Sequence, residues 1–232
     1  MTGRHTRLIV LTVLATMVLS APTFSHQDSR PLTEQQIADL RAYAEDDVET
    51  QFHLGVSYAN GLRVPKDDVE ATRWFRMAAE QGNMFAQNAL GAHYAAGIGV
   101  SEDDAEAVQW WLLAAEQGLA LAEFNLGLKY STGEGVPLDE VEAARWFRLA
   151  AEQGHLGAQE FLGAKYWIGK GVPQDYVQSH MWLNLAASRL TGEDREKAVE
   201  GGASVALLMT PAKIAEAQRL AREWEAAHPR EP

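Results

Sequence analysis

The sequence predicts an all-α protein, a solenoid of about four helix-turn-helix repeats with capping helices at both ends. One observation is a period of 36 residues, at which a glycine, a tyrosine and a tryptophan each recur four times. A second is the string Ala-Ala-Glu-Gln-Gly, found at 78–82, 114–118 and 150–154. Such a period indicates a solenoid, because one helix pair buries its apolar face only against its neighbours. The recurring residues are Gly55, Gly91, Gly127 and Gly163; Tyr58, Tyr94, Tyr130 and Tyr166; Trp74, Trp110, Trp146 and Trp182.

Each repeat is predicted to hold two helices. In the second repeat, Leu90 and Tyr94 lie on one face of a first helix, and Gly97 follows as a helix-breaking residue. Asp103, with Glu106 three residues later, is an acidic variant of the capping box and opens a second helix. Gly118 closes that helix. The four repeats are 48–83, 84–119, 120–155 and 156–191, and the other cap pairs are Asp67/Glu70, Asp139/Glu142 and Asp175/Gln178.

The recurring glycine falls in the middle of each first helix, where glycine costs about 1 kcal/mol relative to alanine. A sequence that repeats this cost four times indicates that paired helices approach closely there. The recurring tryptophan and the large residue after it are expected to fill the space between the helices. These following residues are Phe75, Trp111, Phe147 and Leu183.

The chain ends differ from the repeats. Residues 26–47 are expected to form an N-terminal capping helix, which Thr33 and Gln36 open and which runs to about Ala44. Residues 192–232 are expected to form C-terminal capping helices. Gly201-Gly202 should interrupt the helical pattern there. Thr210-Pro211 should then start the last helix, which ends near Ala227.

Composition excludes several classes of function. The chain has 232 residues, of which 47% are hydrophobic, so it is long and apolar enough for a sizeable core. It has no cysteine, which excludes thiol catalysis, disulfides and thiolate metal sites. Its formal charge is −12, and such an acidic surface repels phosphate backbones, so no nucleic-acid partner is expected.

Residues 1–25 have the pattern of a signal peptide. Arg4 and Arg7 precede the apolar run 8–19, whose 12 residues are too few for a bilayer span of about 20. Small residues follow, so cleavage is expected after Ser20 or Ser25. Removing residues 1–25 takes away two arginines and no acidic residue, so the formal charge falls from −12 to −14. We therefore expect a periplasmic or secreted protein with no stable membrane insertion after cleavage.

The combined motif Ala-x-x-x-Leu-Gly-x-x-Tyr-x-x-Gly-x-Gly-Val…Ala-x-x-Trp…Ala-Ala-x-x-Gly resembles the Sel1-like repeat, a relative of the tetratricopeptide repeat. The resemblance covers about residues 48–190 and departs from the motif at Arg63, where a turn glycine is usual, and at Ser179, where alanine is usual. It implies a right-handed α-α superhelix and a role in protein–protein interaction, often in assembly, signalling or envelope processes.

No catalytic constellation is present in the sequence. There is no His-Glu-x-x-His, no phosphate-binding loop, no Gly-x-Ser-x-Gly and no Ser-x-x-Lys. No catalytic residue, cofactor or metal site is therefore predicted. His53 and His93 lie on first helices without further ligands at helical spacing, and we expect both to face solvent.

The predicted function is a non-enzymatic scaffold that binds a partner protein or peptide on the concave face formed by the first helices. Helical-wheel positions that face away from the repeated core set vary among repeats, and several are apolar. Trp167 is added because it replaces small residues of the other repeats, and a packing role against the C-terminal cap is an equal alternative. The predicted binding residues are Phe52, His53, Val56, Asn60, Asn88, Phe124, Asn125, Leu128, Glu160, Phe161 and Trp167. Ile168 occupies an equivalent apolar position.

Two alternatives remain at this point. One is an envelope hydrolase acting on cell-wall or β-lactam substrates, which only the disputed enzymatic members of the resembled family motivate. The other is a structural homo-oligomer, in which the apolar residues bind another copy of the chain. The mature charge of −14 follows from the sequence and favours a basic partner.

The export hypothesis predicts a cleaved N-terminus. When the protein is expressed in a bacterium with a periplasm, the mature chain should begin between Ala21 and Gln27, because the short apolar run is followed by small residues. Intact-mass analysis of the periplasmic fraction measures this. A full-length chain held in the membrane would show that residues 1–25 are an anchor.

Overall fold

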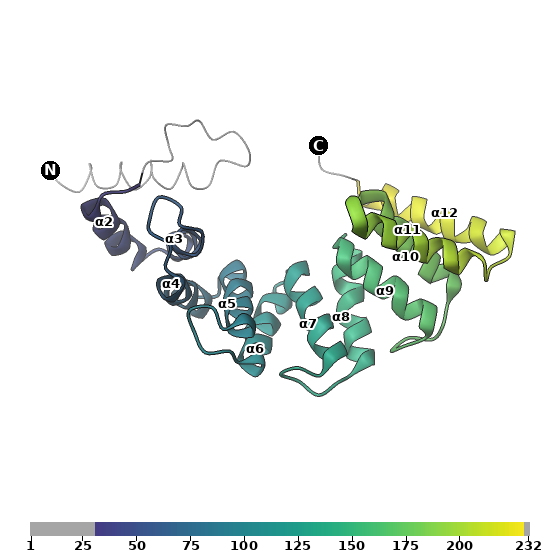
Figure 1. Cartoon of the computed structure of the whole chain (residues 1–232), viewed down its shortest axis with the longest axis horizontal. Coiled ribbons are helices and arrows are strands. Elements are labelled where there is room, and N and C mark those ends of the chain that lie inside the picture. The colour runs from purple at the N-terminus through teal and green to yellow at the C-terminus, as the bar shows by residue number, and fades with distance from the viewer. Residues whose placement is uncertain (1–30, 230–232) are drawn as a thin grey trace. The chain divides into compact units, whose positions relative to one another are not determined.

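The computed structural model describes residues 31–229, so the predicted signal peptide 1–25 lies outside the described part. Between residues 31 and 229 the chain forms eleven α-helices and no strand, which confirms the all-α prediction (Figure 1). The helices are α2 Glu34–Ala44, α3 Val48–Asn60, α4 Asp68–Glu80, α5 Met84–Ala96, α6 Asp104–Glu116, α7 Ala120–Thr132, α8 Glu140–Glu152, α9 Leu156–Ile168, α10 Tyr176–Arg189, α11 Gly192–Ala206 and α12 Pro211–Ala227.

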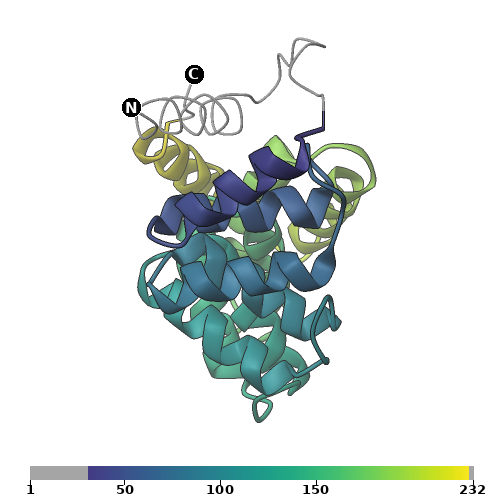
Figure 2. The same cartoon turned by 90° about the vertical axis from the view of Figure 1, so that its left-hand side faces the viewer.

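The chain divides into two compact units at residue 114. In unit 1, α2 packs on α3, α3 on α4, and α4 on α5, so these helices lie side by side in sequence order (Figure 2). The core between them includes Leu54, Trp74, Phe75 and Leu90, and each of these side chains is buried. The capping helix α2 thus covers the first repeat, as the sequence predicts.

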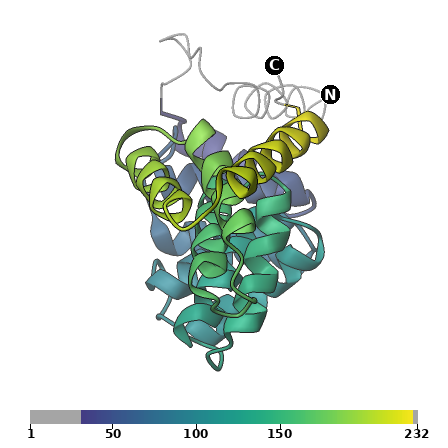
Figure 3. The ribbon, with the colours of Figure 1, turned by 90° about the vertical axis from the view of Figure 1, so that its right-hand side faces the viewer.

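In unit 2, α7 packs on α8, α8 on α9, and α9 on α10. Both α11 and α12 then pack on α10 (Figure 3). The core here includes Phe147, Leu162, Trp182 and Leu185. Trp224 of α12 closes it, with its ring 6.1 Å from that of Trp182 in a T-shaped arrangement.

The recurring glycine of each first helix lies under a large side chain of the paired second helix. A Cβ atom on Gly55 would come within 2.6 Å of the Phe75 ring, and one on Gly127 within 2.6 Å of the Phe147 ring. Gly91 lies in the same way under Trp111, and Gly163 under Leu183. The close approach predicted from the repeated glycine is confirmed. The side chain that makes it is the residue after the recurring tryptophan.

The four recurring tryptophans are not equally buried. Trp74, Trp146 and Trp182 are buried, as predicted. Trp110 is only half-buried, and its indole N–H donates to a Glu106 carboxylate oxygen at 3.0 Å. The expectation that Trp110 fills the space between its helix pair is therefore wrong. Trp111, the neighbour that covers Gly91, fills that space instead.

The predicted helix caps are present. The Asp67 carboxylate accepts hydrogen bonds from the backbone N–H groups of Val69 and Glu70, and Asp139 and Asp175 cap α8 and α10 in the same way. Thr33 and Gln36 form a complete capping box at α2. These bonds satisfy backbone donors that an α-helix leaves unpaired at its start.

The turn after each first helix explains the departure at Arg63. Gly99 lies against the backbone carbonyl of Asp68 in the preceding repeat, and Gly171 lies against that of Glu140, so neither place has room for a Cβ atom. Arg63 adopts the same left-handed conformation, with φ of 63°. Its turn contacts the chain before α2, where the Leu32 N–H donates to the Arg63 carbonyl at 2.8 Å. A side chain is tolerated there because no preceding second helix with this contact is present in the described residues.

Gly201 and Gly202 do not interrupt the helical pattern, contrary to expectation. Helix α11 runs through both, from 192 to 206. A Cβ atom at Gly202 would lie 3.3 Å from the Asn184 side chain, which is a tight contact, so a small residue there keeps α11 close to α10. A Cβ atom at Gly201 would lie 3.4 Å from Leu183, which is an ordinary contact. The helix is retained because packing on α10 offsets the low helix propensity of glycine.

Glycine-to-alanine substitutions in unit 2 should separate close approach from helix propensity. Gly127→Ala should lower the free energy of unfolding by about 1–3 kcal/mol, because the new methyl group collides with the Phe147 ring. Gly201→Ala should raise it by about 0.5–1 kcal/mol, since its Cβ atom meets only ordinary contacts. Urea titration measures both changes. Stabilisation by Gly127→Ala would show that the ring is not held over the glycine.

Candidate functional site

Exposed apolar side chains gather on one face of α9. Phe161 is 42% exposed, Ile168 is 61% exposed, and Ala164 between them is also exposed. We call these three residues the α9 stripe. Their spacing of three and four residues places them on one side of the helix. Large apolar residues that share one exposed face are typical of interaction surfaces.

A cluster of rings lies beside and beneath the α9 stripe. Phe161 stacks on buried Phe147, with centroids 5.1 Å apart, and meets Phe124 edge-on at 5.8 Å. Phe124 also stacks on His155 at 4.4 Å. Phe124 was placed on a helix face away from the core, but it is half-buried and packs on the core of unit 2. The rings fix Phe161 in position and leave part of it exposed.

His155 joins the ring cluster to the helix that carries the stripe. Its Nδ1 atom accepts a hydrogen bond from the Ala158 N–H at 3.2 Å and caps the start of α9. Burial lowers the pKa of His155. A neutral ring with its proton on Nε2 suits this cap, because a protonated imidazole has no acceptor.

Unit 1 carries a smaller counterpart of this cluster. The centroid of the Phe52 ring lies 6.0 Å from those of the Phe75 and Phe85 rings, and Phe85 is exposed. His53 was expected to face solvent, but its side chain is only 16% exposed, and its Nε2 atom lies 3.1 Å from a carboxylate oxygen of Glu49. The centroid of its ring lies 5.4 Å from that of the Phe52 ring, in a tilted arrangement.

The remaining predicted residues are spread over both units and are mostly half-buried. Asn60 is exposed, and its side-chain amide donates to the Val56 carbonyl. The Asn88 carbonyl accepts from the Trp111 indole at 3.2 Å. The Trp167 carbonyl accepts from the Gln174 amide at 2.7 Å. Half-buried positions of the set are Phe52, Val56, Asn88, Phe124, Asn125, Leu128, Glu160 and Trp167.

His93 is buried, so the expectation that it faces solvent is also wrong. It is 8% exposed, and its Nδ1 atom lies 2.7 Å from the Thr72 hydroxyl of the preceding repeat. Burial lowers the pKa of His93, although the nearby Ile98 carbonyl and Asp68 carboxylate oppose this shift. The physical reason is that this position of a first helix packs against the first turn of the preceding second helix.

In unit 2 the equivalent position holds Lys165, which is also buried. Its Nζ atom lies 2.5 Å from one Glu140 oxygen, and Lys170 lies 2.6 Å from the other. Burial alone would raise the pKa of Glu140, but the hydrogen bonds from both lysines outweigh it and lower this pKa. This cluster, in which Lys165 is buried and Lys170 is exposed, joins two repeats, and no predicted site residue belongs to it.

Glu123 is a buried carboxyl group that the sequence analysis missed. The equivalent residues of the other repeats are Gln51, Gln87 and Gln159, all buried. Burial raises the pKa of Glu123, and a hydrogen bond from the Gln153 amide at 2.8 Å opposes this. In the sequence, Glu123 could have been noticed because it replaces the glutamine that the other three repeats have at this position.

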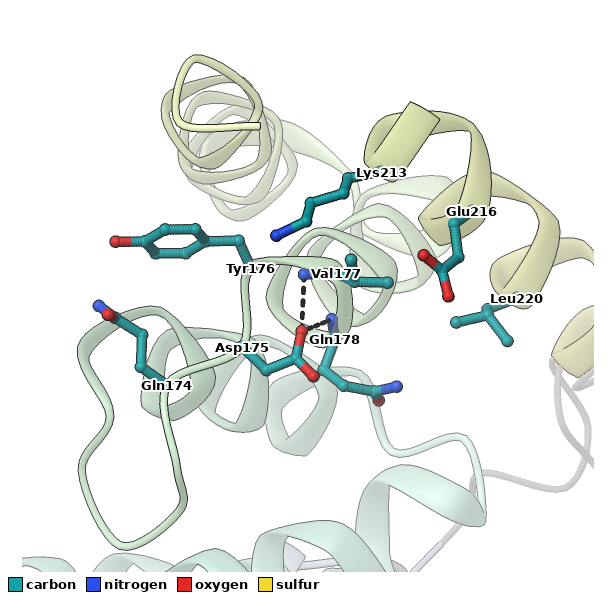
Figure 4. A pocket seen from close by; sticks show the side chains of 8 residues that line it. All are labelled: Gln174, Asp175, Tyr176, Val177, Gln178, Lys213, Glu216 and Leu220. Atoms are coloured by element: carbon teal, nitrogen blue, oxygen red, sulfur yellow. Dashed lines mark hydrogen bonds between the residues drawn. The ribbon is translucent and has the colours of Figure 1, made fainter. Parts of the chain in front are cut away.

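One pocket of unit 2 lies apart from the predicted set. It has a volume of about 490 Å³, and Lys213 and Glu216 of α12 face the first turn of α10 across it (Figure 4). At the start of α4 and of α8, the first turn of the helix is covered by the loop of the following repeat, through Gly99 and Gly171 respectively. The loop 207–210 between α11 and α12 has only four residues, whereas the loop 169–175 between α9 and α10 has seven. The shorter loop leaves the first turn of α10 uncovered. None of the predicted site residues lines this pocket.

Within residues 31–229, no three His, Asp or Glu side chains are grouped to hold a metal ion. The same search range contains no helix with the length and apolar character needed to cross a bilayer. The polar contacts described above either join two repeats, as His93–Thr72 and Lys165–Glu140 do, or lie within one, as Glu123–Gln153 does.

Replacing His155 with Asn tests the cap beside the stripe, because Asn83 caps α5 in the same way. The pKa of His155 is lowered from 6.5, so its neutral form stabilises the fold fully above that pH and this stability is lost as the pH falls below it. As the pH falls from about 7.5 to about 5.5, the free energy of unfolding of His155→Asn should rise relative to that of the wild type. The change should be less than about 1.4 kcal/mol per pH unit. Urea titration at each pH measures this, and a constant difference would contradict it.

Comparison with known proteins supports the repeat assignment. A protective antigen of uropathogenic Escherichia coli, c5321, whose crystal structure displays an SLR fold, is 36% identical over 72% of this chain, with a TM-score of 0.65. A Sel1 repeat protein from Oxalobacter formigenes is 31% identical over 84% of this chain, with a TM-score of 0.68. This chain spans 40% and 55% of the lengths of these two proteins. A search of curated proteins gives no significant match.

The comparison with protein families matches four stretches of the chain. The Sel1 repeat family matches the chain at 48–83, 85–119, 120–155 and 157–189, which together make up more than half of its length. The chain therefore belongs to the Sel1 repeat family.

Proposed function

We propose that this chain is an exported, non-enzymatic scaffold of the bacterial envelope that holds a partner protein segment on its first-helix surface. Sel1 repeat proteins generally mediate protein–protein interaction, and the family is typically non-catalytic. The periplasmic location is proposed from the signal-peptide pattern of residues 1–25.

The α9 stripe is the observation that carries this proposal. Phe161 is anchored by stacking on Phe147, so its exposed part needs little further ordering when a partner binds. Ile168 extends the same face by two helical turns. A rigid aromatic residue beside an exposed aliphatic one is a common anchor in protein interfaces.

A photo-crosslinking amino acid at position 168 tests the proposal in living cells. Position 141 provides the matched control, because Val141 is 65% exposed on the second helix α8 of the same unit. We expect a specific crosslinked adduct from position 168 and none from position 141, with the partner identified by mass spectrometry. Absence of any adduct at 168 in cells that express the protein normally would contradict the proposal.

The mass of the adduct also separates a partner protein from self-association. An adduct of twice the chain mass would show that another copy of this chain occupies the stripe. Equal adducts at 168 and 141 would show that exposure alone determines crosslinking, and the first-helix surface would then have no special role.

A further inference from the structure

The surface beside the α9 stripe is acidic. Helix α11 contacts α9 and carries four exposed carboxylate side chains. We call these the α11 acidic edge; they are Glu193, Asp194, Glu196 and Glu200. The repeat period places Glu196 and Glu200 at the positions that Glu160 and Ala164 occupy on α9. The first-helix surface of unit 2 therefore changes from apolar on α9 to acidic on α11.

This part of α11 also carries two basic residues, Arg195 and Lys197, and both are exposed. Lys197 lies 3.0 Å from a Glu193 oxygen and 3.7 Å from an Asp194 oxygen. Four carboxylates against two basic residues leave this part of the helix with a formal charge of −2. By the repeat period, Glu196 and Glu200 occupy the positions that continue the surface of α9.

Glu160 extends the negative charge to the border of the stripe. It is half-buried on α9, directly before Phe161. Burial raises the pKa of Glu160, and the neighbouring Asp194 raises it further, while Lys197 acts in the opposite direction. An additional positive charge beside Glu160 would be attracted both by this carboxyl group and by Asp194.

The apolar part has the dimensions of one helix face. Residues 161 to 168 rise by about 10.5 Å along α9 at 1.5 Å per residue. An amphipathic helix presents apolar residues at positions i, i+3 or i+4, and i+7, over the same length. Its polar flank would then lie over α11, where the carboxylates are.

We infer that the α9 stripe and the α11 acidic edge together bind a basic amphipathic helix of a partner protein. Its apolar face covers Phe161, Ala164 and Ile168, and its lysines or arginines pair with Glu160, Glu196 and Glu200. This inference rests on the proposed function and adds the chemistry of the partner. An anionic lipid surface is disfavoured as the ligand, because the acidic edge would repel it.

The probe is a synthetic amphipathic peptide of about 18 residues, five helical turns, with leucines on one face and lysines on the other. A matched peptide carries glutamates in place of the lysines. Fluorescence anisotropy with the purified mature protein should show binding of the lysine peptide at least about tenfold tighter than the glutamate peptide. Its affinity should fall as salt rises from about 0.05 M to about 0.5 M.

Matched variants locate the binding. Ile168→Ser should lower the affinity for the lysine peptide about tenfold, whereas Val141→Ser should leave this affinity unchanged. Both side chains are exposed, so neither substitution should disturb the fold. The double variant Glu160→Gln, Glu200→Gln should lower the affinity for the lysine peptide by about the same factor. It should also make this affinity less dependent on salt concentration. The control Glu152→Gln removes an exposed carboxylate of α8 and should have no effect. Unchanged melting temperatures verify folding.

The outcomes separate this inference from the proposed function. If both peptides bind equally well and Ile168→Ser weakens both, the stripe binds helices but the basic partner is overturned. If the charge variants behave as Glu152→Gln does, the acidic edge has no part in binding. If Ile168→Ser affects neither peptide, both the inference and the proposed function fail. Tighter binding to anionic vesicles than to the lysine peptide would replace the protein partner by a membrane surface.

Discussion

Each helix pair of this protein depends on one contact, a large side chain of the second helix lying on a glycine of the first. In both Gly55–Phe75 and Gly127–Phe147 a Cβ atom would come within 2.6 Å of the ring. Because interiors are close-packed, this contact fixes both the spacing and the rotation of the two helices. The rotation decides which residues of the first helix face the preceding repeat and which remain on the outer surface. The contact between Gly163 and Leu183 sets the rotation of α9 in this way, and the rotation leaves the α9 stripe on the outer surface.

The junctions between repeats use polar groups, and these vary from one repeat to the next. His93 meets Thr72 in unit 1, whereas Lys165 meets Glu140 at the same repeat position in unit 2. A buried ion pair gains little net stability, because desolvation offsets the attraction. It does penalise a wrong neighbour, since an unpaired buried lysine would be costly. We attribute the order in which repeats stack to these differing pairs, and the stability of each pair of helices to the glycine contact.

The period of the sequence was sufficient to predict the helices and their caps, because both depend on local spacing. Asp67 caps α4 and Thr210 caps α12 at the predicted places. The burial of His93 could not be predicted in this way, since a single helix wheel does not contain the preceding repeat. Glycine was likewise ambiguous: Gly97 ends a helix, but Gly201 lies inside α11, which is retained because it packs on α10. Of the predicted surface, Phe161 is exposed, while Phe124 is partly used by packing, which depends on the ring cluster that only the fold assembles.

Function in such a fold resides in the few positions that packing does not constrain. The glycine contact leaves outer first-helix positions free to differ, and here the surface changes within one step of the array from Phe161 and Ile168 on α9 to Glu196 and Glu200 on α11. Apolar contacts supply affinity but discriminate poorly, whereas a row of carboxylates repels acidic partners and selects basic ones. Placing the two side by side on rigid helices lets one partner segment meet both at once. In the proposed binding mode the two kinds of side chain would give specificity only together, since either alone would accept a wider range of partners.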